Sequence, residues 1–149
     1  MPLLISELIS CQKKYILIII GTIFTIAFII VGVILIMKYN ELMKQKEFYY
    51  KQQQERITLY LKHNTKEPNT IKSVHFTSLD KGPLDERIIE GYINNNKDDG
   101  FVAYMVPAYN HQFGGDMLRD ETVQKLLKPS KDRKSPDQIK KELKEKRSK

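Results

Sequence analysis

Few side chains in this sequence are of the types that perform acid–base or nucleophilic chemistry. The chain has three histidines and one cysteine, which are His63, His75, His111 and Cys11. His111 lies in a polar stretch with Asp116 and Glu121, and these three side chains could form a metal site or an acid–base cluster. Their spacing matches no known metal-ligand motif, and Cys11 precedes a long apolar run. We therefore predict a polar loop histidine, no metal or other cofactor, and no enzymatic activity.

A second polar stretch, NNNKDDG at residues 94–100, carries amide and carboxylate oxygens that calcium prefers. It lacks the ligand spacing of a calcium loop. Asn, Asp and Gly tolerate positive φ, so the stretch favours a hairpin connection between two strands.

The strongest structural signal is an uncharged run of 23 residues, 15–37, of which sixteen are Ile, Leu, Val or Phe. At about 1.5 Å per residue it spans roughly 34 Å as a helix, enough for a hydrocarbon core of about 30 Å. The run predicts a transmembrane helix in contact with the lipid bilayer. Gly21, Thr25 and Gly32 fall on one face of it, a pattern that leaves a homodimer through this face open.

Cys11 ends the sequence LISC, which looks like a lipoprotein cleavage box. A lipoprotein signal places its apolar region before the cleavage site, whereas here the apolar run follows it. We therefore predict that Cys11 is a lone thiol beside the membrane, with acylation left open, and that the helix itself is the anchor.

The basic residues flanking the run give conflicting information about orientation. Two precede it and four follow it closely, which favours a cytoplasmic carboxyl part; they are Lys13, Lys14, Lys38, Lys44, Lys46 and Lys51. Long domains are translocated largely regardless of charge, and a short amino tail ending in two lysines also suits a signal anchor. The charge pattern alone leaves both orientations open.

The formal net charge of +7 does not indicate a nucleic-acid partner, because of how it is distributed. Residues 48–130 carry eleven basic and eleven acidic side chains, whereas residues 131–149 carry nine basic and four acidic ones. The excess therefore lies mainly in a tail, which we expect to be solvated. With one cysteine, no disulfide can form within the chain, so the domain must be held together by packing.

The pattern predicts a short tail (1–14), the membrane helix (15–37), an α+β domain (38–130) and a basic tail or helix (131–149). Residues 40–64 contain no Gly or Pro and show apolar or amide side chains at helical spacing, namely Tyr50, Gln53, Ile57, Tyr60 and Leu61. This helix should pack on a sheet. Ser135, Pro136 and Gln138 form a capping signature for a last helix.

Three stretches with strand character, 71–79, 87–94 and 101–107, are joined by turn-forming sequences and predict antiparallel pairing. The third is apolar on both faces, so we expect it inside the sheet. We expect a fourth strand around Tyr109 to Phe113, and a helix at 120–128 capped by Asp120.

Three motifs, at Leu59–Asn64, Glu90–Asn96 and Phe113–Leu118, resemble those of an uncharacterised family of small Gram-positive surface proteins, many of them lipoproteins. The resemblance covers roughly residues 48–128; Met117 is an insertion relative to the family pattern. It implies a cystatin-like α+β domain held outside the membrane. Some such lipoproteins look like immunity proteins against toxins of the type VII secretion system, including lipases. This chain differs in having a helix in place of the lipid anchor.

The resemblance implies that the domain is extracellular and binds a secreted protein toxin without chemistry of its own. Tyr109, His111, Phe113 and Asp116, beside a Gly-Gly turn, are the candidate partner-binding residues. A core role for Tyr109 and Phe113 is the alternative. The other candidate function is an accessory or scaffold subunit of a membrane or secretion complex.

Overall fold

The computed structural model describes residues 2–148, with the side chains of residues 12–148. The elements follow the order α1 (Pro2–His63), β1 (Val74–Lys81), β2 (Arg87–Ile93), β3 (Gly100–Met105), η1 (Pro107–Tyr109), β4 (Met117–Arg119), α2 (Glu121–Leu126), η2 (Ser130–Asp132) and α3 (Pro136–Arg147). The chain forms two compact units, the first ending at Glu47 and the second beginning at Phe48. The predicted α+β class, with one long apolar helix and an antiparallel sheet, is confirmed.

In the first unit, α1 contains the whole uncharged run 15–37, and its large apolar side chains are exposed. Within residues 12–148, α1 is the single helix long and apolar enough to cross a membrane. Space around Gly21 and Gly32 is open, and the Thr25 hydroxyl donates to the Thr22 carbonyl of the same helix. A homodimer through this face stays a prediction. The side chain of Cys11 lies outside the described part of the chain.

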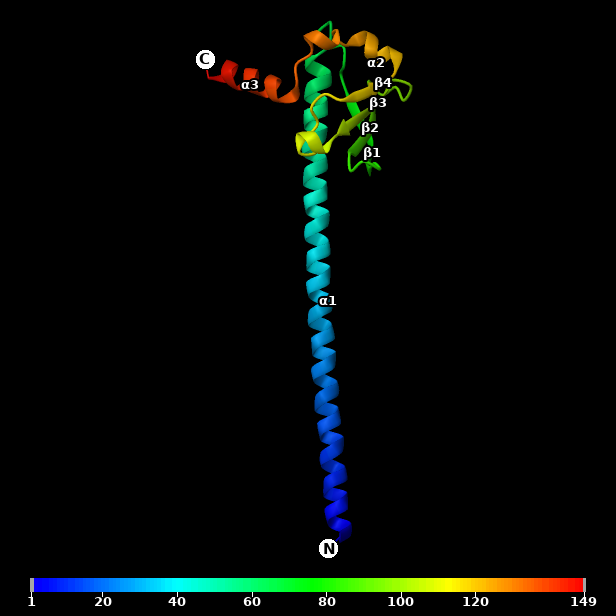
Figure 1. Ribbon diagram of the computed structural model, residues 1–149, viewed down its shortest axis with the longest axis vertical. Coiled ribbons are helices and arrows are strands. Elements are labelled where there is room, and N and C mark those ends of the chain that lie inside the picture. The colour runs from blue at the N-terminus through cyan, green and yellow to red at the C-terminus, as the bar shows by residue number, and fades with distance from the viewer. Residues whose placement is uncertain (1, 149) are drawn as a thin grey trace. The chain divides into compact units, whose positions relative to one another are not determined.

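The second unit is built on a four-stranded antiparallel sheet with the strand order β1-β2-β3-β4 (Figure 1). The predicted hairpin at 94–100 joins β2 to β3, where Asn94 and Asn95 adopt positive φ. Strand β3 lies inside the sheet, as its two apolar faces predicted. A bulge between Phe76 and Ser78 interrupts the pairing of β1 with β2.

The last turns of α1 pack on one face of this sheet. The prediction that the side chains at helical spacing in residues 40–64 pack on a sheet is confirmed, because Ile57, Tyr60 and Leu61 are buried. They form one core with apolar side chains of the sheet, of α2 and of the residue after it, namely Ile89, Ile93, Phe101, Ala103, Met105, Val123 and Leu127. Burying a side chain of this size contributes roughly 1.5–3 kcal/mol, so this contact between α1 and the sheet stabilises the domain.

The fourth strand was predicted in the wrong place. Residues 109–113 are not a strand; η1 occupies Pro107–Tyr109, and β4 lies at Met117–Arg119. Asn110 and His111 have φ of 51° and 55°, a left-handed conformation that an extended strand cannot contain. The segment is therefore a loop leading from β3 to β4.

Two predictions about the carboxyl-terminal part also need correction. Asp120 stands at the amino end of α2, but its carboxylate does not cap that helix and instead accepts a hydrogen bond from the Gly100 amide at 2.7 Å. Ser135 forms the expected capping box with Gln138. The tail is not wholly solvated, because Pro136 and Ile139 are fully buried.

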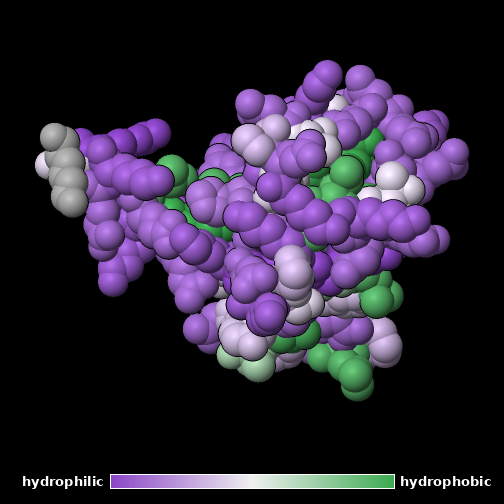
Figure 2. Space-filling model, turned by 90° about the horizontal axis from the view of Figure 1, so that it is seen from above, coloured by the Kyte–Doolittle hydropathy of each residue, from purple (hydrophilic) through white to green (hydrophobic). Residues whose placement is uncertain are grey.

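In Figure 2 the face seen from above is mainly hydrophilic, with apolar atoms in small separate patches.

Candidate functional site

The candidate site is the segment 107–116 between β3 and β4, called here the Tyr109 loop. Its first half is a tight turn in which the amides of Tyr109 and His111 both donate to the Val106 carbonyl at 3.1 Å. Asn110 and His111 hold left-handed φ angles, which cost non-glycine residues free energy and persist only where surrounding contacts impose them. Those contacts come from α1.

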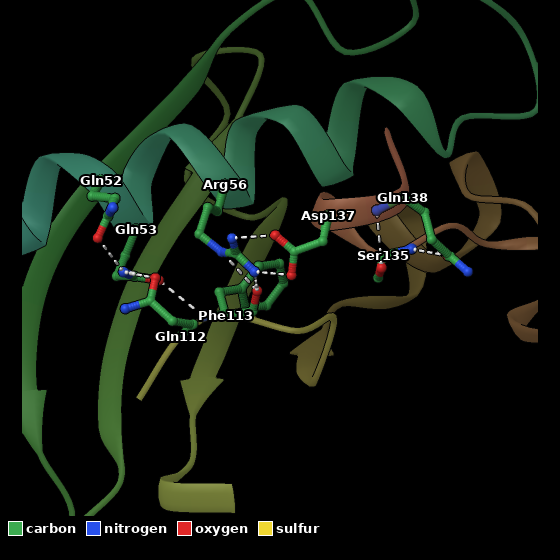
Figure 3. A network of polar contacts seen from close by, with 8 residues as sticks. All are labelled: Gln52, Gln53, Arg56, Gln112, Phe113, Ser135, Asp137 and Gln138. Carbon is green, nitrogen blue, oxygen red and sulfur yellow. Dashed lines mark hydrogen bonds and ion pairs between the residues drawn. The ribbon is translucent and has the colours of Figure 1, made fainter. Parts of the chain in front are cut away.

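Three consecutive turns of α1 reach the backbone of the Tyr109 loop. The Tyr49 hydroxyl donates to the His111 carbonyl at 2.6 Å, and burial raises the pKa of this phenol while Arg87 opposes the rise. The buried Gln53 side chain accepts from the Phe113 amide at 2.9 Å and donates to the Gln112 side chain at 3.0 Å (Figure 3). The side chain of Gln53 thus satisfies the buried Phe113 amide, which has no neighbouring strand to pair with among residues 2–148.

Arg56 completes this attachment. Its Nε and Nη2 atoms donate to the Phe113 carbonyl at 3.0 and 2.9 Å, and its Nη1 and Nη2 atoms donate to the Asp137 carboxylate at 2.7 and 2.8 Å (Figure 3). Arg56 is 7% exposed. The hydrogen bond from Arg56 lowers the pKa of Asp137. One guanidinium therefore joins α1, the Tyr109 loop and the first turn of α3.

The structure separates the predicted partner-binding residues into two groups. Tyr109 and Asp116 are exposed, and the Tyr109 side chain is 56% accessible beside Gly114. Phe113 is fully buried and meets Tyr60 edge-to-face at 5.4 Å between ring centroids. Its ring is therefore a core group that holds the loop down, which was the alternative left open by the sequence, and it is not available to a partner.

His111 is half-buried at the base of the loop. Its Nε2 atom lies 3.5 Å from Asp85 Oδ2, and its Nδ1 atom is buried without a hydrogen-bond partner. The pKa of Asp85 is lowered, first by the hydrogen bond from Lys81 and to a smaller extent by His111. Asp85 connects the turn between β1 and β2 to the loop.

The hypothetical cluster of His111, Asp116 and Glu121 is not assembled. Glu121 pairs with Lys125 on α2, and among the residues that the structure describes no three His, Cys, Asp or Glu side chains lie close enough to hold a metal ion. His63 lies at the end of α1, where burial and then Lys134 lower its pKa, and His75 stacks on Tyr92. The histidines are therefore spread over separate parts of the domain.

Sequence reasoning missed the residues that position the loop, above all Arg56 and Asp137. A signal for Arg56 was present, because it lies three residues after Gln53 on the helical face that carries Tyr60. A long charged side chain on an apolar helix face needs a buried partner. Nothing in the local sequence indicated that the buried partner is the Phe113 carbonyl, 57 residues further along the chain, or that Asp137, 81 residues further, pairs with the same side chain.

Comparison with known proteins places the domain among its relatives. A search of curated proteins found no match to the chain. Among solved structures, the chain is similar to the solution NMR structure of the folded 79-residue fragment of Lin0334 from Listeria innocua, with 29% identity, a TM-score of 0.49, and coverage of 64% of this chain and 94% of that one. The family described as Protein of unknown function (DUF1433) matches residues 49–141. This match spans more than half of the chain and includes the whole Tyr109 loop, so the protein belongs to the DUF1433 family.

Proposed function

We propose that this protein is a membrane-anchored, non-enzymatic binding protein that protects its own cell by neutralising a secreted protein toxin at the outer membrane surface. The toxin class suggested by the family resemblance is an effector of the type VII secretion system, such as a lipase. In this proposal α1 anchors the protein, and the domain that begins at Phe48 carries the binding surface.

The observation that carries the proposal is the rigid attachment of the Tyr109 loop. Tyr49 donates to the His111 carbonyl, Gln53 accepts from the Phe113 amide and Arg56 donates to the Phe113 carbonyl, while Tyr109 remains 56% exposed. Holding a binding loop in one conformation before association reduces the entropy lost on binding. Tyrosine is enriched at protein interfaces because it presents a large amphipathic ring with few rotatable bonds.

The anchor supports the same interpretation. A binding protein that acts on a toxin at the membrane needs to be held there, and α1 is a candidate membrane span. The resemblance to surface lipoproteins that look like immunity proteins favours an extracellular domain, with the helix replacing the lipid. The number of lysines on each side of the helix favours a cytoplasmic domain instead, so an extracellular domain is part of the proposal and is tested by a separate measurement.

The test is a protection assay in a toxin-sensitive strain that expresses each candidate toxin found to be encoded near this gene. Wild-type protein should restore growth, and Tyr109→Ala should weaken protection by removing an exposed aromatic contact. Leu118→Ala is the matched control, because Leu118 is similarly exposed at 63% but lies on β4, outside the loop. His111→Ala tests the base of the loop.

Each result has a defined meaning. Failure of the wild-type protein to protect against any toxin encoded nearby would contradict immunity and favour an accessory subunit of a membrane complex. Protection that survives Tyr109→Ala and is lost in Leu118→Ala would keep the function and move the contact surface to the outer face of the sheet. Variant levels in the membrane fraction must match those of the wild type.

A further inference from the structure

The face of the sheet that points away from α1 is partly apolar. Successive residues of a strand point to opposite faces, and Ile89, Ala103 and Met105 are buried in the core shared with α1. The residues beside them therefore point outward, as does exposed Leu118 on β4. The outer face thus carries four apolar or aromatic side chains, namely Ile88, Val102, Tyr104 and Leu118. The solvated face of an antiparallel sheet is ordinarily polar, so this face is suited to a contact.

Three exposed carboxylates surround these apolar side chains. Asp80 pairs with Ile88 at one edge of the sheet, and Asp116 lies opposite Tyr104 at the other edge of the same row, where the Tyr104 amide donates to its carbonyl at 2.9 Å. Glu90 stands in the next row. Among residues 12–148, no basic side chain forms an ion pair with any of the three carboxylates.

A groove of about 660 Å³ continues from Glu90 toward the hairpin at 94–100. The charges at that end are mixed, since Lys97 and Arg119 line the groove together with Asp120. The uncompensated negative charge therefore lies in the other half of the outer face. We call this half the acidic sheet face, and it consists of Asp80, Ile88, Glu90, Val102, Tyr104, Asp116 and Leu118.

Helix α3 is attached to the domain by its first turn only. Arg56 binds Asp137 there, and Ile139 is fully buried. The remainder of α3 extends away from the sheet (Figure 1). Its later turns therefore do not meet the acidic sheet face of their own chain.

The exposed side of α3 has the opposite charge to the acidic sheet face. At about 100° per residue, one stripe of about 100° contains an apolar side chain among three basic ones, namely Lys140, Leu143, Lys144 and Arg147. All are exposed except Lys140, which is half-buried. Glu142 and Glu145 lie about 100° and 160° from Leu143, outside this stripe, and Glu142 is bound by Lys134 at 2.6 Å.

The two surfaces also match in size. Asp80 and Asp116 are three strand spacings apart, which is roughly 14 Å. The Cα atoms of Lys140 and Arg147 are separated by roughly 10 Å along the helix, and their long side chains extend further. A helix that crosses the strands therefore brings its two outer cations to the two edge carboxylates and places Leu143 over the apolar middle.

Both halves of this complementary pair belong to the same chain. Residues 68–124 carry five basic and nine acidic side chains, whereas residues 125–148 carry ten basic and four acidic ones. Opposite charge of this kind steers two surfaces together and fixes their orientation. Because α3 extends away from its own sheet, the acidic sheet face that it meets is that of another copy.

We propose that α3 of one copy docks on the acidic sheet face of a second copy. Leu143 packs on the apolar middle, and the cations at helical spacing around it pair with the carboxylates. The contact joins two different surfaces, so it is heterologous. It is separate from a homodimer through α1, and it shares only Asp116 with the Tyr109 loop, so it is independent of toxin binding.

The first measurement is cross-linking of the full chain in detergent micelles, in an equal mixture of ordinary and isotope-labelled chains. A carbodiimide joins an amine of Lys140 or Lys144 directly to a carboxylate that it touches, and mass spectrometry identifies the joined residues. About half of the links from α3 to the acidic sheet face should join an ordinary chain to a labelled one, because copies pair at random.

Charge reversal on one surface at a time gives the decisive comparison. An α3 variant with Lys144→Glu and Arg147→Glu should form about tenfold fewer mixed links than the wild type, and so should a sheet variant with Asp80→Lys and Glu90→Lys. All four side chains are exposed, so the domain should fold in both variants. Mixing the two variants should restore links between Lys144 of the sheet variant and Glu90 of the α3 variant.

The matched control changes the same amount of charge outside the stripe. Lys131→Glu with Lys141→Glu alters two exposed lysines, of which Lys141 lies about 160° from Leu143 on α3. This double variant should form as many mixed links between α3 and the acidic sheet face as the wild type.

Absence of mixed links in the wild type would overturn the proposal, as would links found only within single chains. Mixed links that survive unchanged in the α3 variant would also overturn it, by showing that the copies associate through another surface such as α1. Failure of the two variants to restore each other would exclude pairing between these two surfaces. None of these outcomes bears on toxin protection.

Discussion

Replacing Arg56 by methionine tests whether one buried guanidinium holds the Tyr109 loop in place. Methionine keeps the unbranched stem that packs beside the core and removes only the charged head. The Phe113 carbonyl then loses both of its guanidinium donors, which lie at 3.0 and 2.9 Å, and Asp137 loses its ion pair.

The two losses differ in size because the two acceptors differ in exposure. A buried carbonyl left without a donor costs about 1–3 kcal/mol. The Asp137 side chain is 71% exposed, so its ion pair contributes only about 0.2–1 kcal/mol after solvent screening. We expect Arg56→Met to lower the free energy of unfolding by about 1–4 kcal/mol and Asp137→Asn to lower it by about 1 kcal/mol or less.

The measurement is denaturant unfolding of the full chain in detergent micelles, followed by tyrosine fluorescence, since the chain has eight tyrosines and no tryptophan. The double variant gives the coupling between the two side chains, which should not exceed about 1 kcal/mol. Amide exchange at Gln112 and Phe113 should accelerate in Arg56→Met and change little in Asp137→Asn.

Two outcomes would refute this reasoning. Equal destabilisation by Arg56→Met and Asp137→Asn would mean that the ion pair to α3, not the bond to the loop carbonyl, is the main contribution. A loss below about 1 kcal/mol in Arg56→Met would mean that water replaces the guanidinium at the carbonyl without significant cost.

Four further predictions concern the same domain and its anchor. Gln53→Leu should cost about 1–3 kcal/mol in denaturant unfolding, because it leaves the buried loop amide without an acceptor; a neutral result would show that the amide finds water. Ile57→Asp should cost several kcal/mol, since Ile57 is fully buried and an unpaired charge there has no compensation; an unchanged melting temperature would remove it from the core. The hydrogen bond from Arg56 lowers the pKa of Asp137 in the folded state. The stabilisation from the ionised carboxylate is therefore complete above about pH 4 and is lost as the pH falls through the lower folded-state pKa. The difference in melting temperature between wild type and Asp137→Asn should accordingly shrink below about pH 4. Protease added to intact protoplasts should digest the domain and leave the anchor, whereas full protection of the domain would place it in the cytoplasm.

The folded domain shows which features a local pattern can predict. The stripe containing Ile57 and Leu61, the inner position of β3, the hairpin at 94–100 and the capping box at Ser135 all depend on residues close together in the chain. Periodicity, turn chemistry and capping act over a few residues, so they can be detected without a fold. The misplaced fourth strand shows the limit, because apolar character at Tyr109 and Phe113 did not reveal the left-handed backbone between them.

By itself, the sequence determined the uncharged run that forms a candidate membrane span, the α+β class and the neutral charge of residues 48–130, because each follows from composition or short-range order. Tertiary structure alone decided which polar groups became buried and what they contact. Arg56 reaches Asp137 across 81 residues, and Asp120 bonds to Gly100 instead of capping its own helix. Burial and hydrogen-bond partners depend on segments that only folding brings together. For this reason the sequence predicted a strand around Tyr109 to Phe113, whereas in the structure this segment is a loop whose backbone is hydrogen-bonded to α1.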